Sequence, residues 1–185
     1  MSRHATPIVY LDFETTGGVA DHDRILEIGL IRVDEGKTRE WETLVNPERP
    51  MPDIVKTLTG LKDADLVPAP VFADVIDTLE EYVRGATVVA HNAPFEREFL
   101  RAEFERLGRA APYAQYVCTR RLSGIIWPEL PKHSMDVVAD HAGLKLSGKR
   151  HRALSDARLA FDLWKLWRTT VPKLALEAAI RSSFV

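Results

Sequence analysis

A short apolar segment that carries two acids constrains this chain most. Residues 7–17 read Pro-Ile-Val-Tyr-Leu-Asp-Phe-Glu-Thr-Thr-Gly, with Asp12 and Glu14 near the end of the apolar run. Side chains alternate across a β-strand, so the two acids share one face, while Val9 and Leu11 share the other. Neighbouring carboxylates in an apolar strand repel each other, and a divalent cation such as magnesium or manganese relieves that repulsion. The segment predicts either a buried strand ending at a metal site or a frayed strand end whose acids face water.

The length of the chain allows one well-buried core. Its 185 residues contain no Pro-, Gly- or Ser-rich stretch long enough for an interdomain linker, so residues 1–185 are expected to form a single domain. No apolar run approaches the roughly 18 residues that a membrane-spanning helix needs, and the first residues lack the apolar region of a signal peptide. A single cysteine, Cys118, excludes an internal disulfide and fits a reducing compartment. We therefore expect a cytoplasmic protein with no membrane partner.

The charge balance limits how the chain could bind nucleic acid. A net charge of −2 argues against coating nucleic acid by bulk electrostatics, but not against an enzyme that holds a few phosphates through metal ions. Two local basic runs read equally well as solvated surface or as functional groups. One contains Lys145, Lys149, Arg150, His151 and Arg152, and the other contains Arg97, Arg101, Arg106 and Arg109.

The order of predicted elements indicates an α/β fold. Strands over 24–33 and 40–46, joined by a hairpin turn at 34–37, extend the first strand into an antiparallel meander. Further short apolar strands are expected at 86–90 and 115–118. Helices are predicted by apolar periodicity and by Gly, Pro or Ser boundaries over 54–58, 70–83, 94–107, 120–126, 134–141, 152–167 and 172–181. The result is a mixed sheet, with three antiparallel strands followed by parallel strands, flanked by helices.

Two more acids, Glu96 and Asp156, lie at positions that are predicted to be close to the apolar core. In the helix over 152–167, Asp156 shares the inward stripe with Leu159 and Leu163, which is expensive unless the carboxylate is paired or binds a metal. His151 lies five residues before Asp156. Glu96 opens the helix that follows the buried strand at 86–90. These residues are the candidates to join the acids of the first strand.

Three segments together identify a family resemblance. They are residues 12–17 (Asp-Phe-Glu-Thr-Thr-Gly), 91–96 (His-Asn-Ala-Pro-Phe-Glu) and 151–156 (His-Arg-Ala-Leu-Ser-Asp). In this order and spacing, the chain resembles DEDDh-type 3′→5′ exonucleases, the DnaQ-like group of the RNase H-like superfold that includes proofreading subunits, RNase T and oligoribonuclease. The resemblance covers about residues 7–167. The one departure is Glu96, where the family usually has the shorter Asp.

The resemblance implies an RNase H-like fold and a two-metal mechanism with Mg²⁺ or Mn²⁺. Asp12 would bridge both ions, Glu14 and Asp156 would hold one of them, and Glu96 would support the other. His151 would act as general base on the attacking water. The products would be nucleoside 5′-monophosphates, released from the 3′ end of single-stranded DNA or RNA.

Substrate-binding candidates come from the same motifs. Thr15, Thr16 and Gly17 could offer backbone N–H groups and hydroxyls to the terminal nucleotide, and His91 and Asn92 belong to the second motif. Leu61 matches a family position that wedges against the last base, although it reads equally well as a core leucine.

Several functions share these motifs. The leading interpretation is a stand-alone exonuclease, with a polymerase proofreading subunit of the epsilon kind as an alternative. An exoribonuclease would use the same site, and the sequence does not choose between the two sugars. A nucleic-acid-binding module with weakened catalysis is the third alternative, for which Glu96 is the only positive evidence. A homodimer or a polymerase partner is compatible with the sequence but not indicated by it.

Overall fold

A five-stranded mixed sheet forms the centre of the molecule. The computed structural model describes residues 6–145, 148 and 150–185, and within them the strand order is β3-β2-β1-β4-β5. The strands are β1 (Ile8–Thr15), β2 (Ile25–Asp34), β3 (Lys37–Leu44), β4 (Thr87–Ala90) and β5 (Gln115–Cys118). The first three pair antiparallel, whereas β4 pairs parallel with both β1 and β5. The predicted mixed sheet is confirmed.

The hairpin turn that was predicted at 34–37 joins β2 to β3. Asp34 pairs with Lys37, which leaves only Glu35 and Gly36 in the turn, at φ values of 48° and 80°. Positive φ at both positions is the geometry of a two-residue turn whose twist matches the flanking strands. Pairing therefore resumes directly after the turn, and β3 begins three residues before the predicted start at residue 40.

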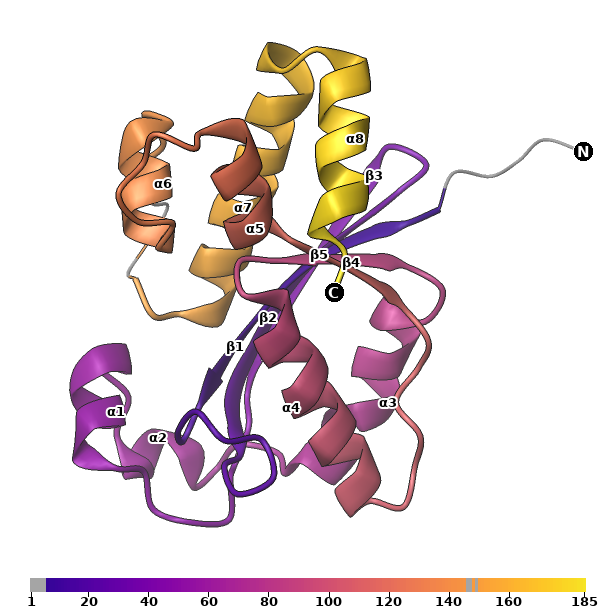
Figure 1. Ribbon diagram of the computed structural model, residues 1–185. Coiled ribbons are helices and arrows are strands. Elements are labelled where there is room, and N and C mark those ends of the chain that lie inside the picture. Colours follow the sequence, from indigo (N-terminus) through magenta and orange to yellow (C-terminus); the bar gives the residue numbers. More distant parts are fainter. Residues whose placement is uncertain (1–5, 146–147, 149) are drawn as a thin grey trace, which may run out of the picture.

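Helices cover both faces of the sheet (Figure 1). They are α1 (Asp53–Thr59), α2 (Asp63–Leu66), α3 (Phe72–Val83), α4 (Ala93–Arg106), α5 (Thr119–Ile126), α6 (Met135–His141), α7 (Ala153–Thr170) and α8 (Lys173–Ser183). Helices α3 and α4 pack on one face and α5 to α8 on the other, while α1 and α2 enclose a small third core. Among the described residues, no helix is both long enough and apolar enough to cross a membrane.

Strand β1 contributes to both large cores, as its alternating pattern predicted. Leu11 and Phe13 pack on the side of α3 and α4. Tyr10 points to the other face, where its ring lies 5.0 Å from that of Phe161 on α7. Because side chains alternate along a strand, Asp12 emerges on the Tyr10 face, toward α7.

Gly29 allows α7 to start close to the sheet. A Cβ on Gly29 would lie 2.0 Å from the backbone nitrogen of Leu154 and 2.2 Å from the carbonyl carbon of Ala153. Gly29 is also the partner of Asp12 in the β1–β2 ladder. Residues directly opposite each other in a ladder share a face of the sheet. The missing side chain of Gly29 therefore brings the first turn of α7 beside Asp12.

Candidate active site

The three sequence motifs line one cleft. It has a volume of about 320 Å³ and takes side chains from β1, from the start of α4 and from the start of α7. The four predicted acids and the predicted histidine all line it: Asp12, Glu14, Glu96, His151 and Asp156. His91, Asn92, Met135 and Arg150 complete its polar and apolar walls, together with Phe13 and Phe95.

The sheet topology explains why residues far apart in sequence meet here. Strands β1 and β4 are parallel neighbours, so their carboxyl ends lie at the same edge of the sheet. Helix α4 begins directly after β4, which places Glu96 in its first turn next to Asp12. From the other side of the sheet, α7 adds Asp156 through the close approach at Gly29.

Burial and mutual repulsion raise the pKa values of the acids. The pKa of Asp12 lies well above its usual range because the group is buried and because Glu96, Asp156 and Glu14 lie nearby. Burial raises the pKa of Glu14 to about 8, with the charge of Asp156 adding to the effect. Burial likewise raises the pKa of Glu96 to about 8. Such a cluster favours protons or a cation over four bare charges.

The donor set fits a divalent cation. Ligand atoms of Glu14, His151 and Asp156 lie within 4.8 Å of one another. Glu96 Oε2 and Asp156 Oδ1 are buried and accept no hydrogen bond from the described residues. A buried carboxylate oxygen without a donor is costly, and coordination of a hard cation such as Mg²⁺ or Mn²⁺ removes that cost.

His151 adopts a backbone conformation that is unusual for its residue type. Its φ is 57°, in the left-handed region that non-glycine residues seldom occupy and that costs about 1 kcal/mol or more. Its N–H donates to Asp156 Oδ2 over 3.3 Å, which ties the residue to the first turn of α7. The conformation holds the imidazole beside Glu14 and Asp156.

Sequence reasoning missed the role of Glu27, which anchors the start of α7. Glu27 is 2% exposed and accepts from Arg152 Nε at 3.0 Å and Arg152 Nη2 at 2.8 Å, and from the N–H of Ala153 at 3.3 Å. It pairs with Glu14 in the β1–β2 ladder, so the two share a face of the sheet. The available signal was an acid inside the apolar, buried run that opens β2.

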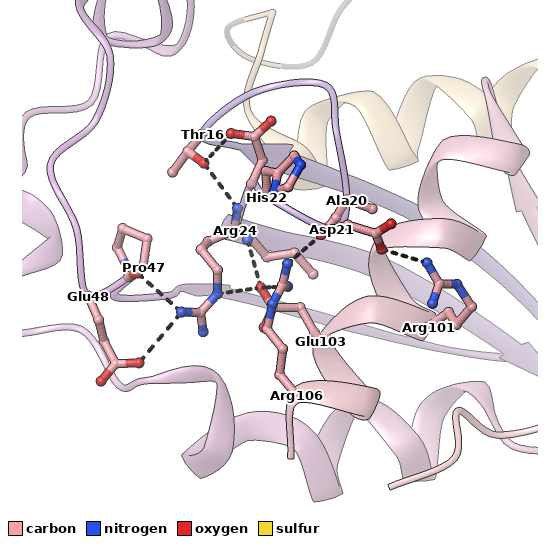
Figure 2. Close-up of polar contacts among 12 residues, drawn as sticks. Thr16, Ala20, Asp21, His22, Arg24, Pro47, Glu48, Arg101, Glu103 and Arg106 are labelled. Carbon is pink, nitrogen blue, oxygen red and sulfur yellow. Dashed lines mark hydrogen bonds and ion pairs between the residues drawn. The ribbon is translucent and has the colours of Figure 1, made fainter. Parts of the chain in front are cut away.

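The loop between β1 and β2 closes on itself through the predicted substrate-binding threonines, of which Figure 2 shows Thr16. The Thr16 hydroxyl donates to Asp23 Oδ1 at 3.0 Å and accepts from the N–H of Arg24 at 3.0 Å. The Thr15 hydroxyl donates to the carbonyl oxygen of Gly17 at 2.6 Å. A Cβ on Gly17 would lie 2.5 Å from the carboxylate of Asp23. Both hydroxyls therefore hold the shape of the loop beside the acids.

A buried glutamate fastens this loop to α4 (Figure 2). Glu103 is 1% exposed and accepts from Arg24 Nε at 2.9 Å and from the N–H of Ile25 at 3.2 Å. Arg106 pairs with Glu103 at 3.2 Å and donates to the carbonyl oxygen of Ala20 in the loop, and Arg101 pairs with Asp21 of the loop at 2.8 Å. The arginines that follow the second motif thus include two that link α4 to the loop.

His91 sits in the cleft with both ring nitrogens engaged. Nε2 lies 2.9 Å from the carbonyl oxygen of His133, which only accepts, so Nε2 carries the proton. Nδ1 then accepts from the Thr119 hydroxyl at 3.0 Å. Burial lowers the pKa of His91 to about 4, so the ring is neutral near pH 7. His91 connects the end of β4 to the segment before α6, while its neighbour Asn92 is exposed.

The remaining candidates are Leu61 and the basic run around Arg150. Leu61 is 6% exposed and packs with Leu26, Val55 and Leu66 in the core under α1 and α2. Lys149 of the basic run lies outside the described residues. Its neighbour Arg150 points into the cleft and forms an ion pair with Asp156, a role that the run of basic residues did not indicate.

Comparisons with known proteins show which family the chain belongs to. The family model for RNase T-like exonucleases, described as Exonuclease, matches residues 9–164. The DNA polymerase III subunit epsilon of Treponema pallidum is 33% identical over 156 residues, covering 83% of this chain and 72% of that protein. The chain belongs to the RNase T-like, DnaQ-like exonuclease family.

Other relatives of this chain are much longer. The PolC-type DNA polymerase III of Caldanaerobacter subterraneus is 31% identical over 157 residues, which cover 84% of this chain but only 11% of that protein. The chain therefore spans about a tenth of the length of such relatives.

Solved structures share the RNase H-like exonuclease fold. Exonuclease X, in complex with 5′ overhanging duplex DNA, superposes with a TM-score of 0.71 at 25% identity and covers 95% of this chain and 99% of its own. The nuclease domain of 3′hExo, a DEDDh family member bound to rAMP, gives a TM-score of 0.75 at 15% identity, covering 92% and 94%. The predicted fold class is confirmed.

Proposed function

We propose that this nuclease is a metal-dependent 3′→5′ exonuclease that releases nucleoside 5′-monophosphates from single-stranded DNA or RNA. The observation that carries the proposal is the convergence of four acids and His151 in one cleft. Residues 1–185 would act as a single exonuclease domain. Family membership supports the nuclease activity, and the polarity of digestion is part of the proposal.

The acids would hold two divalent cations, Mg²⁺ or Mn²⁺. When bound, such a pair neutralises the phosphoryl oxygens and assists the attacking and leaving oxygens. Asp12 would contact both cations, Glu14 and Asp156 one of them, and Glu96 the other. The unpaired oxygens of Glu96 and Asp156 support these assignments.

His151 would accept the proton of the attacking water at a ring nitrogen. Its position beside Glu14 and Asp156 supports this role. Glu27 and Arg152 would hold the start of α7 and the loop before it in place, so that the imidazole stays beside the acids.

The terminal nucleotide would lie against the β1–β2 loop. Thr15, Thr16 and Gly17 would shape that loop, and exposed Asn92 would contact the nucleotide from the start of α4. Neutral His91 would position the cleft wall, and Leu61 would wedge near the last base through a side chain that is buried in the free protein.

A proofreading role is the second candidate. It is favoured by the similarity to a DNA polymerase III epsilon subunit, most of whose length this chain covers. In that case the partner would be a polymerase and the substrate a DNA 3′ end. A nuclease that acts alone would accept single strands without such a partner.

The direct test uses 5′-labelled single-stranded DNA and RNA of the same sequence. With Mg²⁺ or Mn²⁺ we expect a ladder of products shortened from the 3′ end, and no products with EDTA. Asp12→Ala should abolish the ladder, and His151→Ala should slow it by about a hundredfold or more. His141→Ala changes an exposed histidine on α6 and serves as the matched control.

The pattern of products decides between the alternatives. Shortening from the 5′ end would contradict the proposed polarity. Binding of the oligonucleotide without cleavage, in the presence of either metal, would indicate a binding module instead of an enzyme. A rate on RNA far above that on DNA would favour the exoribonuclease, and stimulation by a polymerase would favour proofreading.

A further inference from the structure

Arg150 places a permanent positive charge among the acids of the cleft. Its Nη1 forms an ion pair with Asp156 Oδ2, and its Nε donates to Asp136 Oδ1. Asp136 lies in the first turn of α6 and Asp156 in the first turn of α7. The guanidinium therefore bridges the two helix starts, and 23% of the Arg150 side-chain surface is exposed.

The two oxygens of Asp156 have different surroundings. Oδ2 accepts from Arg150 and, at 3.3 Å, from the N–H of His151. Oδ1 is buried and has no hydrogen-bond partner in the part of the chain that the structure describes. A cation that binds Asp156 therefore meets a carboxylate that already has a positive partner.

The charge of Arg150 reaches beyond Asp156. It opposes the rise in pKa that burial imposes on Asp12 and on Glu14. The other arginine of this region, Arg152, is committed to Glu27 by two donor nitrogens. Arg150 thus supplies the positive charge that lies within the acid cluster itself.

We propose that Arg150 is a positioning residue that competes with a divalent cation for Asp156 and so sets the metal affinity of the site. The inference rests on the proposed metal site. Two like charges at one buried carboxylate repel each other, so cation binding moves the guanidinium off Asp156. Asp136 keeps the released side chain at the rim of the cleft, ready to return when the metal leaves.

Manganese binding to the full chain tests this inference without any activity measurement. Mn²⁺ is titrated into the wild type, Arg150→Gln and Arg150→Lys, and free Mn²⁺ is read by electron paramagnetic resonance. We expect Arg150→Gln to bind Mn²⁺ roughly fivefold more tightly because the competing charge is gone. Arg150→Lys keeps the charge and should stay within about twofold of the wild type.

Arg158→Gln is the matched control. Arg158 also lies on α7, but its guanidinium pairs with half-exposed Glu40, and it does not line the cleft. This variant should bind Mn²⁺ as the wild type does. Arg150→Met, which keeps most of the side-chain volume, repeats the test if Arg150→Gln is not folded by circular dichroism.

The outcomes separate this inference from the proposed function. Equal or weaker Mn²⁺ binding by folded Arg150→Gln or Arg150→Met, beside a wild type that binds Mn²⁺, would overturn the competition and leave the metal site intact. A wild type that binds no Mn²⁺ would overturn the metal site itself, and the competition with it.

Discussion

Glu96 is the residue at which this chain departs from the usual family pattern. Its side chain is 3% exposed, and Oε2 has no hydrogen-bond donor among the described residues. A shorter Asp at the same helical position can still aim a carboxylate into the cleft. We expect Glu96→Asp to keep the rate of 3′ shortening within about tenfold of the wild type, or about 1.4 kcal/mol in the barrier. Glu96→Gln lacks the charge and should reduce the rate of 3′ shortening much more than Glu96→Asp does.

The comparison needs kcat and KM for each variant at saturating Mg²⁺. Glu105→Asp makes the same change on an exposed position of α4 and should leave both constants unchanged. Loss of all activity in Glu96→Asp would show that the longer side chain has a geometry of its own in this enzyme.

The sequence predicted the residues that carry the chemistry better than those that hold them in place. Asp12 and Glu14 stood out as two acids in a short apolar strand, and Asp156 stood out as an acid on the apolar stripe of a helix. Arg150 and Glu27 did not, since their roles depend on ion pairs between segments that only the fold brings together. The hydrogen bonds that Thr15 and Thr16 make within the β1–β2 loop were not predicted either, because a loop closed on itself leaves no periodic pattern.

At the scale of elements, the site depends on how closely α7 approaches the sheet. Gly29→Ala places a Cβ within 2.0 Å of the backbone of Leu154, well inside contact distance. The first turn of α7 must shift, and His151 and Asp156 shift with it. We expect a loss of about 1–3 kcal/mol in the free energy of unfolding, with a fall in kcat, measured by denaturant unfolding and steady-state kinetics.

Gly124→Ala offers a control with the same chemical change. A Cβ there would lie 3.7 Å from the ring of His133, an ordinary contact, within helix α5. Alanine favours a helix over glycine by about 0.8–1 kcal/mol, so this variant should be as stable as the wild type or more stable. Wild-type stability and activity in Gly29→Ala would refute the close approach.

The sequence predicted most helices and strands, but it did not predict the shortest helix or how closely α7 packs against the sheet. Strands and long helices followed from apolar periodicity, and their ends moved by a few residues. Helix α2 has only four residues, about one turn, which is too short for a periodic pattern. The close approach of α7 to Gly29 also could not be predicted. A glycine in a strand can indicate that another backbone packs closely against it, but not which one.

At the scale of the whole molecule, the buried acids couple stability to pH. Burial raises the pKa values of Glu14 and Glu96 from 4.5 to about 8. Between those values the folded protein binds more protons than the unfolded chain, which has already released them. The free energy of unfolding of the metal-free protein therefore falls as pH rises from about 4.5 to about 8.

A divalent cation should reverse this trend, because it binds the deprotonated carboxylates of the folded state and stabilises that state by mass action. We expect Tm in EDTA to fall from about pH 5 to about pH 8, and the gain in Tm on adding Mn²⁺ to be largest at the upper end. Thermal unfolding followed by circular dichroism across this range measures both. Glu14→Gln removes one of the titrating groups and should flatten the EDTA curve. A Tm in EDTA that rises steadily with pH would contradict the raised pKa values and, with them, the strain that a bound metal relieves.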